Sequence, residues 1–175
     1  MQEYYLRELS CADAPVLNRW RNDRPLVGLL GAPYRYIAEE IDANWVSDYL
    51  RARSNCVRLA ICVKDTGQVI GAAYLLSIDW IARSSEFAIW IGEKEFRSKG
   101  VGRFATTKVL EHAFHDLNLN RVHLTVLEDN KSAFELYRKL GFSVEGFHRE
   151  AVYKEGKYLN MVAMSILAAE FSSGF

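Results

Sequence analysis

The feature of this sequence that most restricts its fold is a glycine-containing turn between an apolar run and a long amphipathic segment. Residues 85–92 are apolar, β-branched and aromatic, which is typical of a buried strand. From Val101 to Leu117, apolar side chains recur at every fourth position, which predicts one buried face of a helix. The sequence therefore predicts a buried strand, a tight turn and a helix in direct succession.

The turn itself has the properties of a phosphate site. It combines glycine with positive charge, in the order Arg97, Ser98, Lys99, Gly100, Val101, Gly102 and Arg103. The first N–H groups of a helix have no intrahelical acceptor and lie at the positive end of the helix dipole. The two glycines have no Cβ, so a phosphate can approach these donors closely. We predict a pyrophosphate site; the alternative is a strand-to-helix turn that binds nothing.

Known nucleotide motifs do not explain this turn. It lacks the G-x-x-x-x-G-K-[ST] pattern of ATP-type loops and the G-x-G-x-x-G pattern of dinucleotide folds.

A second motif is more specific. Residues 121–127 alternate as a strand does, and residues 130–140 place Ala133, Leu136, Tyr137 and Leu140 on one face of a short helix that Gly141 ends.

This second motif, residues 130–142, resembles the second acetyl-CoA motif of the GNAT superfamily of N-acetyltransferases. Residues 97–102 resemble the pyrophosphate loop of the same superfamily, in the right order and at a fitting distance. The resemblance extends over about residues 57–167. It implies an α+β fold with a mixed, mostly antiparallel sheet of six to seven strands, flanked by helices and splayed in the middle for acetyl-CoA. We expect one domain over residues 1–175.

The resemblance also implies which residues contact acetyl-CoA, the expected co-substrate. These are residues of the splayed strand, the loop and the second motif: Ile89, Trp90, Ile91, Arg97, Ser98, Lys99, Gly100, Val101, Gly102, Arg103, Asn130 and Ser132. Asn130 has a second interpretation as the N-cap of its helix.

Two residues are candidates for catalysis. Glu86 starts the apolar strand, where superfamily members often carry a carboxylate that faces the substrate, and the alternative is an exposed strand-end charge. Tyr137 matches the tyrosine that protonates the departing thiolate in many members, and the alternative is a core position in the apolar stripe. His112 and His115 have no third partner in a metal pattern, so we expect no metal. No nucleophile motif is present, which favours direct attack without an acyl-enzyme.

The acceptor is less defined. Residues 122–167 are similar to the branch that holds ribosomal-protein-alanine, spermidine and amino-sugar N-acetyltransferases. Residues 20–22 favour the amino-sugar and ribosomal members, whereas Glu39, Glu40 and Asp42 suit a polycation or simply a solvated helix start. We expect a small amine such as an amino sugar or polyamine. The alternatives are a ribosomal-protein or peptide N-terminus, or a non-catalytic acetyl-CoA-binding module.

Composition restricts partners and location. The 22 basic and 22 acidic side chains cancel and neither forms a block, so we expect no nucleic acid partner. The longest apolar run, residues 69–76, is too short to span a membrane, and the N-terminus lacks the apolar part of a secretory signal. The three cysteines form no C-x-x-C pair, which fits reduced thiols in a cytoplasm. The family gives a hint of a homodimer.

The remaining expected elements complete an α+β order. We predict strands at residues 4–9, 57–63 and 69–76 and a closing hairpin of residues 148–153 and 158–166. Helices are predicted at residues 10–20, behind an S-x-x-D capping box, and at residues 37–53. Between these helices, residues 22–36 contain two prolines and two glycines and are predicted to be a long loop.

Overall fold

The structure is a computed structural model that describes residues 2–171. Its helices and strands follow one another as β1 (Tyr4–Glu8), α1 (Ala14–Arg21), α2 (Arg24–Gly28), α3 (Glu39–Arg51), β2 (Val57–Val63), β3 (Val69–Asp79), β4 (Ser84–Ile91), α4 (Val101–Glu111), β5 (Arg121–Leu127), α5 (Lys131–Lys139), β6 (Ser143–Lys154) and β7 (Lys157–Leu167). No helix in this part of the chain is long and apolar enough to cross a membrane.

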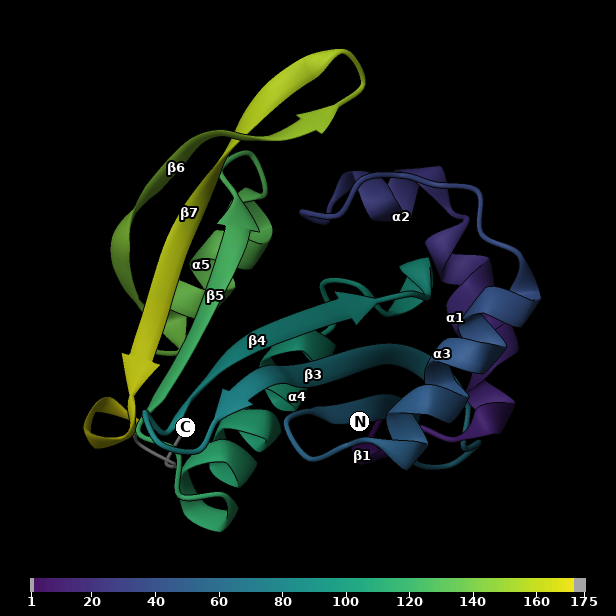
Figure 1. Cartoon of the computed structure of the whole chain (residues 1–175), viewed down its shortest axis with the longest axis horizontal. Coiled ribbons are helices and arrows are strands. Elements are labelled where there is room, and N and C mark those ends of the chain that lie inside the picture. Colours follow the sequence, from purple (N-terminus) through teal and green to yellow (C-terminus); the bar gives the residue numbers. More distant parts are fainter. Residues whose placement is uncertain (1, 172–175) are drawn as a thin grey trace.

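The strands form one seven-stranded sheet in the order β1-β2-β3-β4-β5-β7-β6. Every neighbouring pair is antiparallel except β4 and β5, which run parallel. The mixed, mostly antiparallel sheet confirms the fold expected from the sequence. Figure 1 shows that β4 and β5 start close together and then diverge, so the sheet has the outline of a V.

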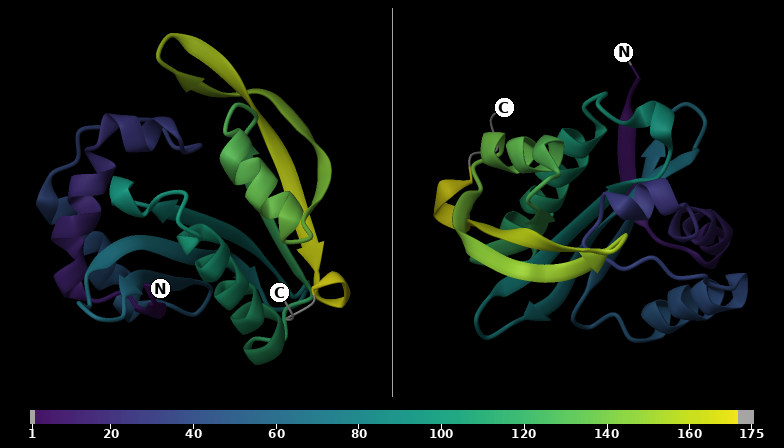
Figure 2. Two further views of the ribbon diagram at one scale, coloured as in Figure 1. Left: turned by 180° about the vertical axis from the view of Figure 1, so that it is seen from behind. Right: turned by 90° about the horizontal axis from the view of Figure 1, so that it is seen from above.

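Helices cover both faces of the sheet. The left view of Figure 2 shows α4 and α5 together on one face of the sheet, α4 over the β1–β4 half and α5 over the β5–β7 half. The apolar side chains of this layer include Phe87, Val101 and Tyr137. On the opposite face, α1 and α3 pack over β2 and β3, in a smaller core that includes Trp20, Tyr74 and Trp90. Side chains alternate along a strand, so successive residues of β4 enter different layers.

The parallel pair is short, and this makes the opening in the sheet. Pairing joins only residues 84–86 of β4 to residues 121–123 of β5. Beyond Glu86, β4 keeps its partner β3 as far as Ile91, while β5 continues with β7 as far as Leu127. The splay predicted near residues 89–91 is therefore present, and it begins earlier than predicted, directly after Glu86.

The structure differs from the local expectations in three places. Residues 22–36 contain the helix α2, because the Asp23 side chain caps it by accepting from the N–H of Leu26 at 3.3 Å and Pro25 suits a first turn. The helix that starts at Val101 changes at residue 112 into a π-helical turn, His112–Asp116. Strand β6 begins at Ser143, five residues earlier than predicted, since two irregularities in its pairing with β7 obscure the alternation.

The β6–β7 hairpin extends past the sheet towards α2, as Figure 1 shows. At the end of this hairpin, Lys154 Nζ donates to the carbonyl oxygens of Val27 at 2.7 Å and Ala32 at 2.6 Å. The side-chain amide of Asn130 donates to the carbonyl of Leu29 at 3.1 Å. The segment after α2 is thus tied to the other arm of the V.

Candidate active site

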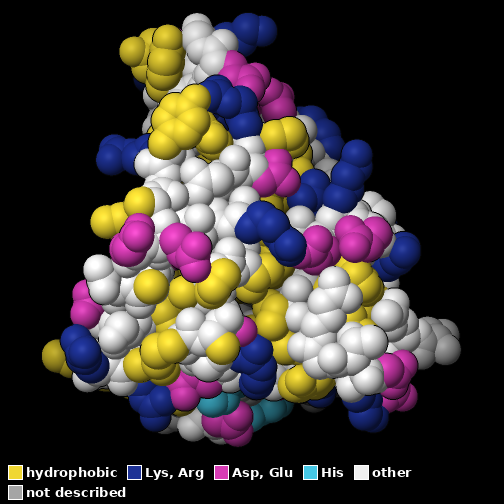
Figure 3. Space-filling model, turned by 90° about the vertical axis from the view of Figure 1, so that its right-hand side faces the viewer, with side chains coloured by type: hydrophobic (Ala, Val, Ile, Leu, Met, Phe, Trp, Pro, Cys, Tyr) yellow, Lys and Arg dark blue, Asp and Glu magenta, His cyan; other side chains and the backbone are white. Residues whose placement is uncertain are grey.

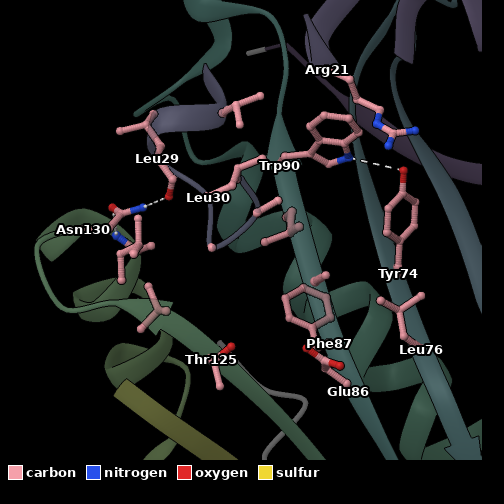
Figure 4. A pocket seen from close by; sticks show the side chains of 18 of the residues that line it. Arg21, Leu29, Leu30, Tyr74, Leu76, Glu86, Phe87, Trp90, Thr125 and Asn130 are labelled. Carbon is pink, nitrogen blue, oxygen red and sulfur yellow. Dashed lines mark hydrogen bonds between the residues drawn. The ribbon is translucent and has the colours of Figure 1, made fainter. Parts of the chain in front are cut away.

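A cleft of about 890 Å³ lies where the sheet opens. Its walls come from α1, from the segment after α2, from β3 and β4, and from β5 and α5 across the opening. Figure 4 shows this arrangement, with Glu86 and Phe87 on β4 and Thr125 on β5 on the two sides of the gap. The cleft therefore brings the second motif opposite the apolar strand β4, while residues 97–103 of the glycine turn lie outside its lining.

The opening exposes backbone donors of β4. The N–H of Gly92 donates to the carbonyl of Ile70 at 2.9 Å, so Gly92 directs its backbone groups towards β3. Because these groups alternate in direction along a strand, the N–H groups of Ile89 and Ile91 face the opposite edge, towards the gap. A polar group of a ligand in the opening can accept from the N–H of Ile89.

The two candidate catalytic residues lie on opposite faces of this opening. Glu86 and Ala88 share the face of β4 that α1 and α3 cover, and Glu86 is half-buried on the cleft wall. Tyr137 projects from α5 into the other core layer, against Phe87. Both residues line the same cleft, so one molecule placed through the gap can contact both.

Tyr137 is held by aromatic packing. Its ring lies 6.3 Å from the Phe87 ring and 5.6 Å from the Phe142 ring, and 7% of the residue is exposed. Its hydroxyl has no hydrogen-bond partner among the described residues. Burial raises the pKa of Tyr137 well above that of a free phenol, because the low-polarity surroundings disfavour the phenolate. The phenol therefore keeps its proton at every ordinary assay pH.

The glycine turn has the geometry of an anion site. Gly100 lies directly before α4 with φ of +82°, a left-handed conformation that favours glycine. The N–H groups of residues 98–102 have no acceptor among residues 2–171, because the first helical bond at this end runs from Phe104 to the carbonyl of Gly100. A Cβ on Gly100 would meet no atom within 4 Å, so this side of the loop is open. These donors fit the pyrophosphate of a coenzyme A group.

Arg97 has a structural position that the sequence did not reveal. Its guanidinium donates to the carbonyls of Ile91 and Gly92, at 3.0 Å each, and so ties the loop to the end of β4. Ser98 and Lys99 are exposed on this loop and Arg103 is exposed in the first turn of α4, and their cofactor contacts stay predictions.

The second motif places its residues beside the opening. Asn130 caps α5, since its side-chain oxygen accepts from the N–H of Ala133 at 3.2 Å, and Asn130 also lines the cleft. Ser132 is exposed in the first turn of the same helix, outside the lining of the cleft. The cap interpretation of Asn130 is confirmed, and the contacts of Asn130 and Ser132 with a cofactor stay predictions.

The N-terminal helices build the far wall of the cleft. Trp20 is buried and donates through Nε1 to Glu93 at 3.0 Å, with its ring against Gly92. Asp42 is fully buried, where it accepts from Asn18 at 2.8 Å and pairs with Arg21. The idea that Asp42 helps to bind a polycation is therefore wrong, because its carboxylate is already bound inside the protein.

Three arginines of this wall were not predicted as site residues. Arg21, Arg35 and Arg58 line the cleft, and they come from α1, the segment after α2, and β2. The Arg58 guanidinium carbon lies 4.2 Å from the centre of the Trp45 ring, 5.3 Å from that of Tyr74 and 5.6 Å from that of Tyr49. Residues 20–22, which include Arg21, favoured some members of the family, whereas nothing in the local sequence signals Arg35 or Arg58. Three distant segments bring these arginines together.

Metal ligands do not gather here. Among residues 2–171, no group of three or more His, Cys, Asp and Glu side chains is placed to hold a metal ion. His112 instead pairs with Asp116 one turn along its helix, at 2.7 Å.

Comparison with known proteins identifies the family to which these features belong. Residues 4–143 match the family described as "Acetyltransferase (GNAT) domain". A spermidine N(1)-acetyltransferase of Escherichia coli K12 is 34% identical over 109 residues, which cover 62% of this chain and 58% of that protein. A spermidine N-acetyltransferase of Vibrio cholerae, solved with CoA and spermine, superposes with a TM-score of 0.87 at 26% identity, covering 95% of this chain and 96% of the other. A dodecameric structure of the Vibrio cholerae enzyme superposes with a TM-score of 0.82 at the same identity, covering 95% of this chain and 94% of the other.

Proposed function

This chain belongs to the GNAT family of acetyltransferases, and from that premise we propose that it transfers the acetyl group of acetyl-CoA to a primary amine. The observation that carries the proposal is the opening between β4 and β5, with Glu86 on one face and Tyr137 on the other. Acetyl-CoA, when bound, supplies the acetyl group as an activated thioester.

Each residue has a distinct task in this proposal. The amine must be neutral to attack, and Glu86 is the group that accepts its proton, directly or through water. The N–H of Ile89, which faces the gap, donates to the developing oxyanion. Tyr137, whose pKa burial raises, holds a proton to deliver to the thiolate on the other face of the sheet.

The lining of the cleft favours direct attack by the amine. The residues that line it include no Cys, Ser or His, so the described part of the chain offers no nucleophile of these kinds for an acyl-enzyme. Initial rates at varied concentrations of both substrates test this point. We expect intersecting lines in a double-reciprocal plot, whereas parallel lines would indicate a covalent intermediate.

Binding of CoA tests the cofactor site itself. A ligand at 100 times its Kd stabilises a fold by about 2.7 kcal/mol, which is roughly 5–10 °C in Tm for a domain of this size. We expect this shift with CoA and with acetyl-CoA, and not with ATP or NAD.

Three variants locate that site on the glycine turn. Gly102→Asp should abolish the shift, because its carboxylate would repel the phosphates beside the free N–H groups. Gly102→Ala should keep most of it, since the new Cβ meets only the flexible end of Leu136, at 3.1 Å. Gly146→Asp, in open space on β6, is the matched control for added charge. An equal shift in Gly102→Asp and the wild type would contradict the assignment.

The acceptor is proposed to be a small amine, such as an amino sugar or a polyamine. The names of the relatives bring spermidine into consideration, and a peptide N-terminus is the alternative. Thiol release from acetyl-CoA, followed by a colour reagent over a panel of polyamines, amino sugars, amino acids, amides and peptides, identifies the class. Turnover with any of them excludes a purely CoA-binding module.

Assembly and location are part of the same proposal. Apolar side chains are exposed on the outer strands, namely Val144, Phe147, Tyr153 and Tyr158. Figure 3 shows hydrophobic side chains at the free end of the β6–β7 hairpin, above a face that mixes both charges. These side chains support a homodimer or larger assembly, which light scattering measures. The three free cysteines support a cytoplasmic location.

A further inference from the structure

We infer that the acceptor carries an anionic group, a carboxylate or a phosphate, besides the amine that is acetylated, and that Arg58 binds this group. The inference rests on the proposed acetyltransferase function and names the substrate class of the same cleft.

The charge of the cleft is the first observation. Its ionisable lining at neutral pH consists of three guanidinium groups, from Arg21, Arg35 and Arg58, and one carboxylate, from Glu86. A polyamine with several positive charges would bring more positive charge into this enclosure and would be repelled. An amine that also carries a negative group would complement it.

Arg58 is the best placed of the three to bind an anion. It forms no salt bridge among residues 2–171, and its Nε is buried without a hydrogen-bond acceptor. Its guanidinium instead lies over the rings of Trp45, Tyr49 and Tyr74. Stacking of this kind fixes the plane of the guanidinium and leaves the donors on its edge for a carboxylate or phosphate.

The other two arginines support this site in different ways. Arg21 pairs with the buried Asp42, so it offers the cleft hydrogen-bond donors while most of its charge is balanced. Figure 4 shows Arg21 at the end of the cleft beside Trp90 and the Tyr74 hydroxyl, with Glu86 at the other end. Arg35 is exposed on the segment after α2 and has no ion-pair partner in the described part of the chain.

The register of the sheet gives the distance between Arg58 and Glu86, the two residues that such an acceptor would contact. Arg58 pairs with Tyr74, and Tyr74 pairs with Ala88, so the three side chains form a row on one face of the sheet. Glu86 lies on the same face, two residues along β4 from Ala88. Ordinary strand spacing and rise place the Cα atoms of Arg58 and Glu86 about 12 Å apart. Both residues line the same cleft, so an acceptor of sugar or amino-acid size can contact both.

Acidic side chains that would bind a polycation lie elsewhere. Glu39 and Glu40 are exposed in the first turn of α3 and do not line the cleft. Asp42 is enclosed with Arg21 and Asn18. The charge of the cleft therefore does not complement a polycation such as the spermine in the complex of the Vibrio cholerae neighbour.

The test compares matched acceptors that differ only in the anion. The pairs are glucosamine with glucosamine 6-phosphate, and an α-amino acid with its amide, and spermidine is the polycation. We expect the anionic member of at least one pair to have a kcat/KM about 10- to 100-fold higher, the range for hydrogen bonds to a charged group. The phosphate and carboxylate pairs distinguish the two sources of the anion. The preference should decrease as salt is raised, a measurement that needs no variant.

Variants assign the preference to Arg58. Arg58→Gln should remove most of it while leaving the KM for acetyl-CoA unchanged, and Arg35→Gln should reduce it less. Arg51→Gln, an exposed arginine of α3 outside the cleft, is the matched control and should retain it. Equal losses on neutral and anionic acceptors in Arg58→Gln would overturn the assignment.

The outcomes separate the inference from the function. If neutral amines or spermidine are acetylated as fast as the anionic ones, the inference is wrong and the acetyltransferase function stands. If no amine or peptide is acetylated although CoA binds, the proposed function fails, and the inference fails with it.

Discussion

Tyr137→Phe isolates the chemistry of one hydroxyl from the packing around it. Tyr137 is 7% exposed, its ring packs against Phe87 and Phe142, and phenylalanine keeps the same ring. The hydroxyl forms no hydrogen bond with the rest of the described chain, so its removal breaks none. We therefore expect a free energy of unfolding within about 1 kcal/mol of the wild type, whereas Tyr137→Ala should lose about 3–5 kcal/mol to the cavity it leaves.

The catalytic effect should be much larger than the effect on stability. If the phenol protonates the thiolate, Tyr137→Phe should lower kcat by about 10²- to 10⁴-fold, the usual range for a positioned general acid. This corresponds to about 2.7–5.5 kcal/mol in the barrier. The assay is thiol release under saturating substrates, together with CoA binding and melting of the same preparation. Unchanged kcat with unchanged CoA binding would refute the role of Tyr137.

The free energy of unfolding at high pH tests whether Tyr137 is buried and protonated in the folded state. Burial keeps Tyr137 protonated in the folded state, while in the unfolded chain it ionises near pH 10. Its contribution is therefore complete below pH 10 and decreases above it, by up to about 1.4 kcal/mol per pH unit. Tyr137→Phe should lose less stability than the wild type between pH 10 and 11.5. Equal losses would contradict the buried, protonated phenol.

Three further predictions concern Glu86, Gly92 and Glu145. Glu86→Gln should lower kcat by about 10²-fold or more with little change in the KM for acetyl-CoA, measured from initial rates. An unchanged kcat would mean that Glu86 is only a strand-end charge. Gly92→Ala should lower the free energy of unfolding, measured with denaturant, by about 1–3 kcal/mol, because a Cβ there would lie 2.0 Å from the Trp20 ring. The control is Gly28→Ala, whose Cβ meets nothing within 4 Å and which should be neutral or stabilising. Glu145 has its pKa lowered to about 2 by the guanidinium it pairs with, so its contribution is present above pH 4.5 and lost as the pH falls towards 2. In Glu145→Gln, the free energy of unfolding should fall less than in the wild type between pH 4.5 and 2. The difference should be below about 1 kcal/mol, because the ion pair with Arg121 is largely exposed.

Local patterns determined much of the fold. Residues 57–63 and 121–127 were predicted as strands, and β2 and β5 have these bounds. In residues 121–127 the signal was alternation, because side chains of a half-buried strand alternate between faces. Where local signals conflicted, the prediction failed. Pro25 and Gly28 indicate a loop, yet the cap at Asp23 and burial of Leu26 and Val27 stabilise the helix α2.

The sequence by itself also indicated the family and predicted an anion site. A glycine turn before a helix has free N–H donors wherever it occurs, so residues 97–103 indicated an anion site without any tertiary information. Glu86 and Tyr137 became candidates through the resemblance of their segments to the GNAT superfamily, and their catalytic roles stay predictions.

Only the tertiary structure decided which charges line the cleft. Arg21, Arg35 and Arg58 are far apart in sequence and meet in one cleft through sheet register and helix packing. Asp42 appears available in the sequence, but the fold encloses it with Arg21. The physical reason is that burial and pairing depend on contacts between distant segments. A sequence pattern reports the face of a helix or strand on which a side chain lies, whereas the fold determines what that face meets.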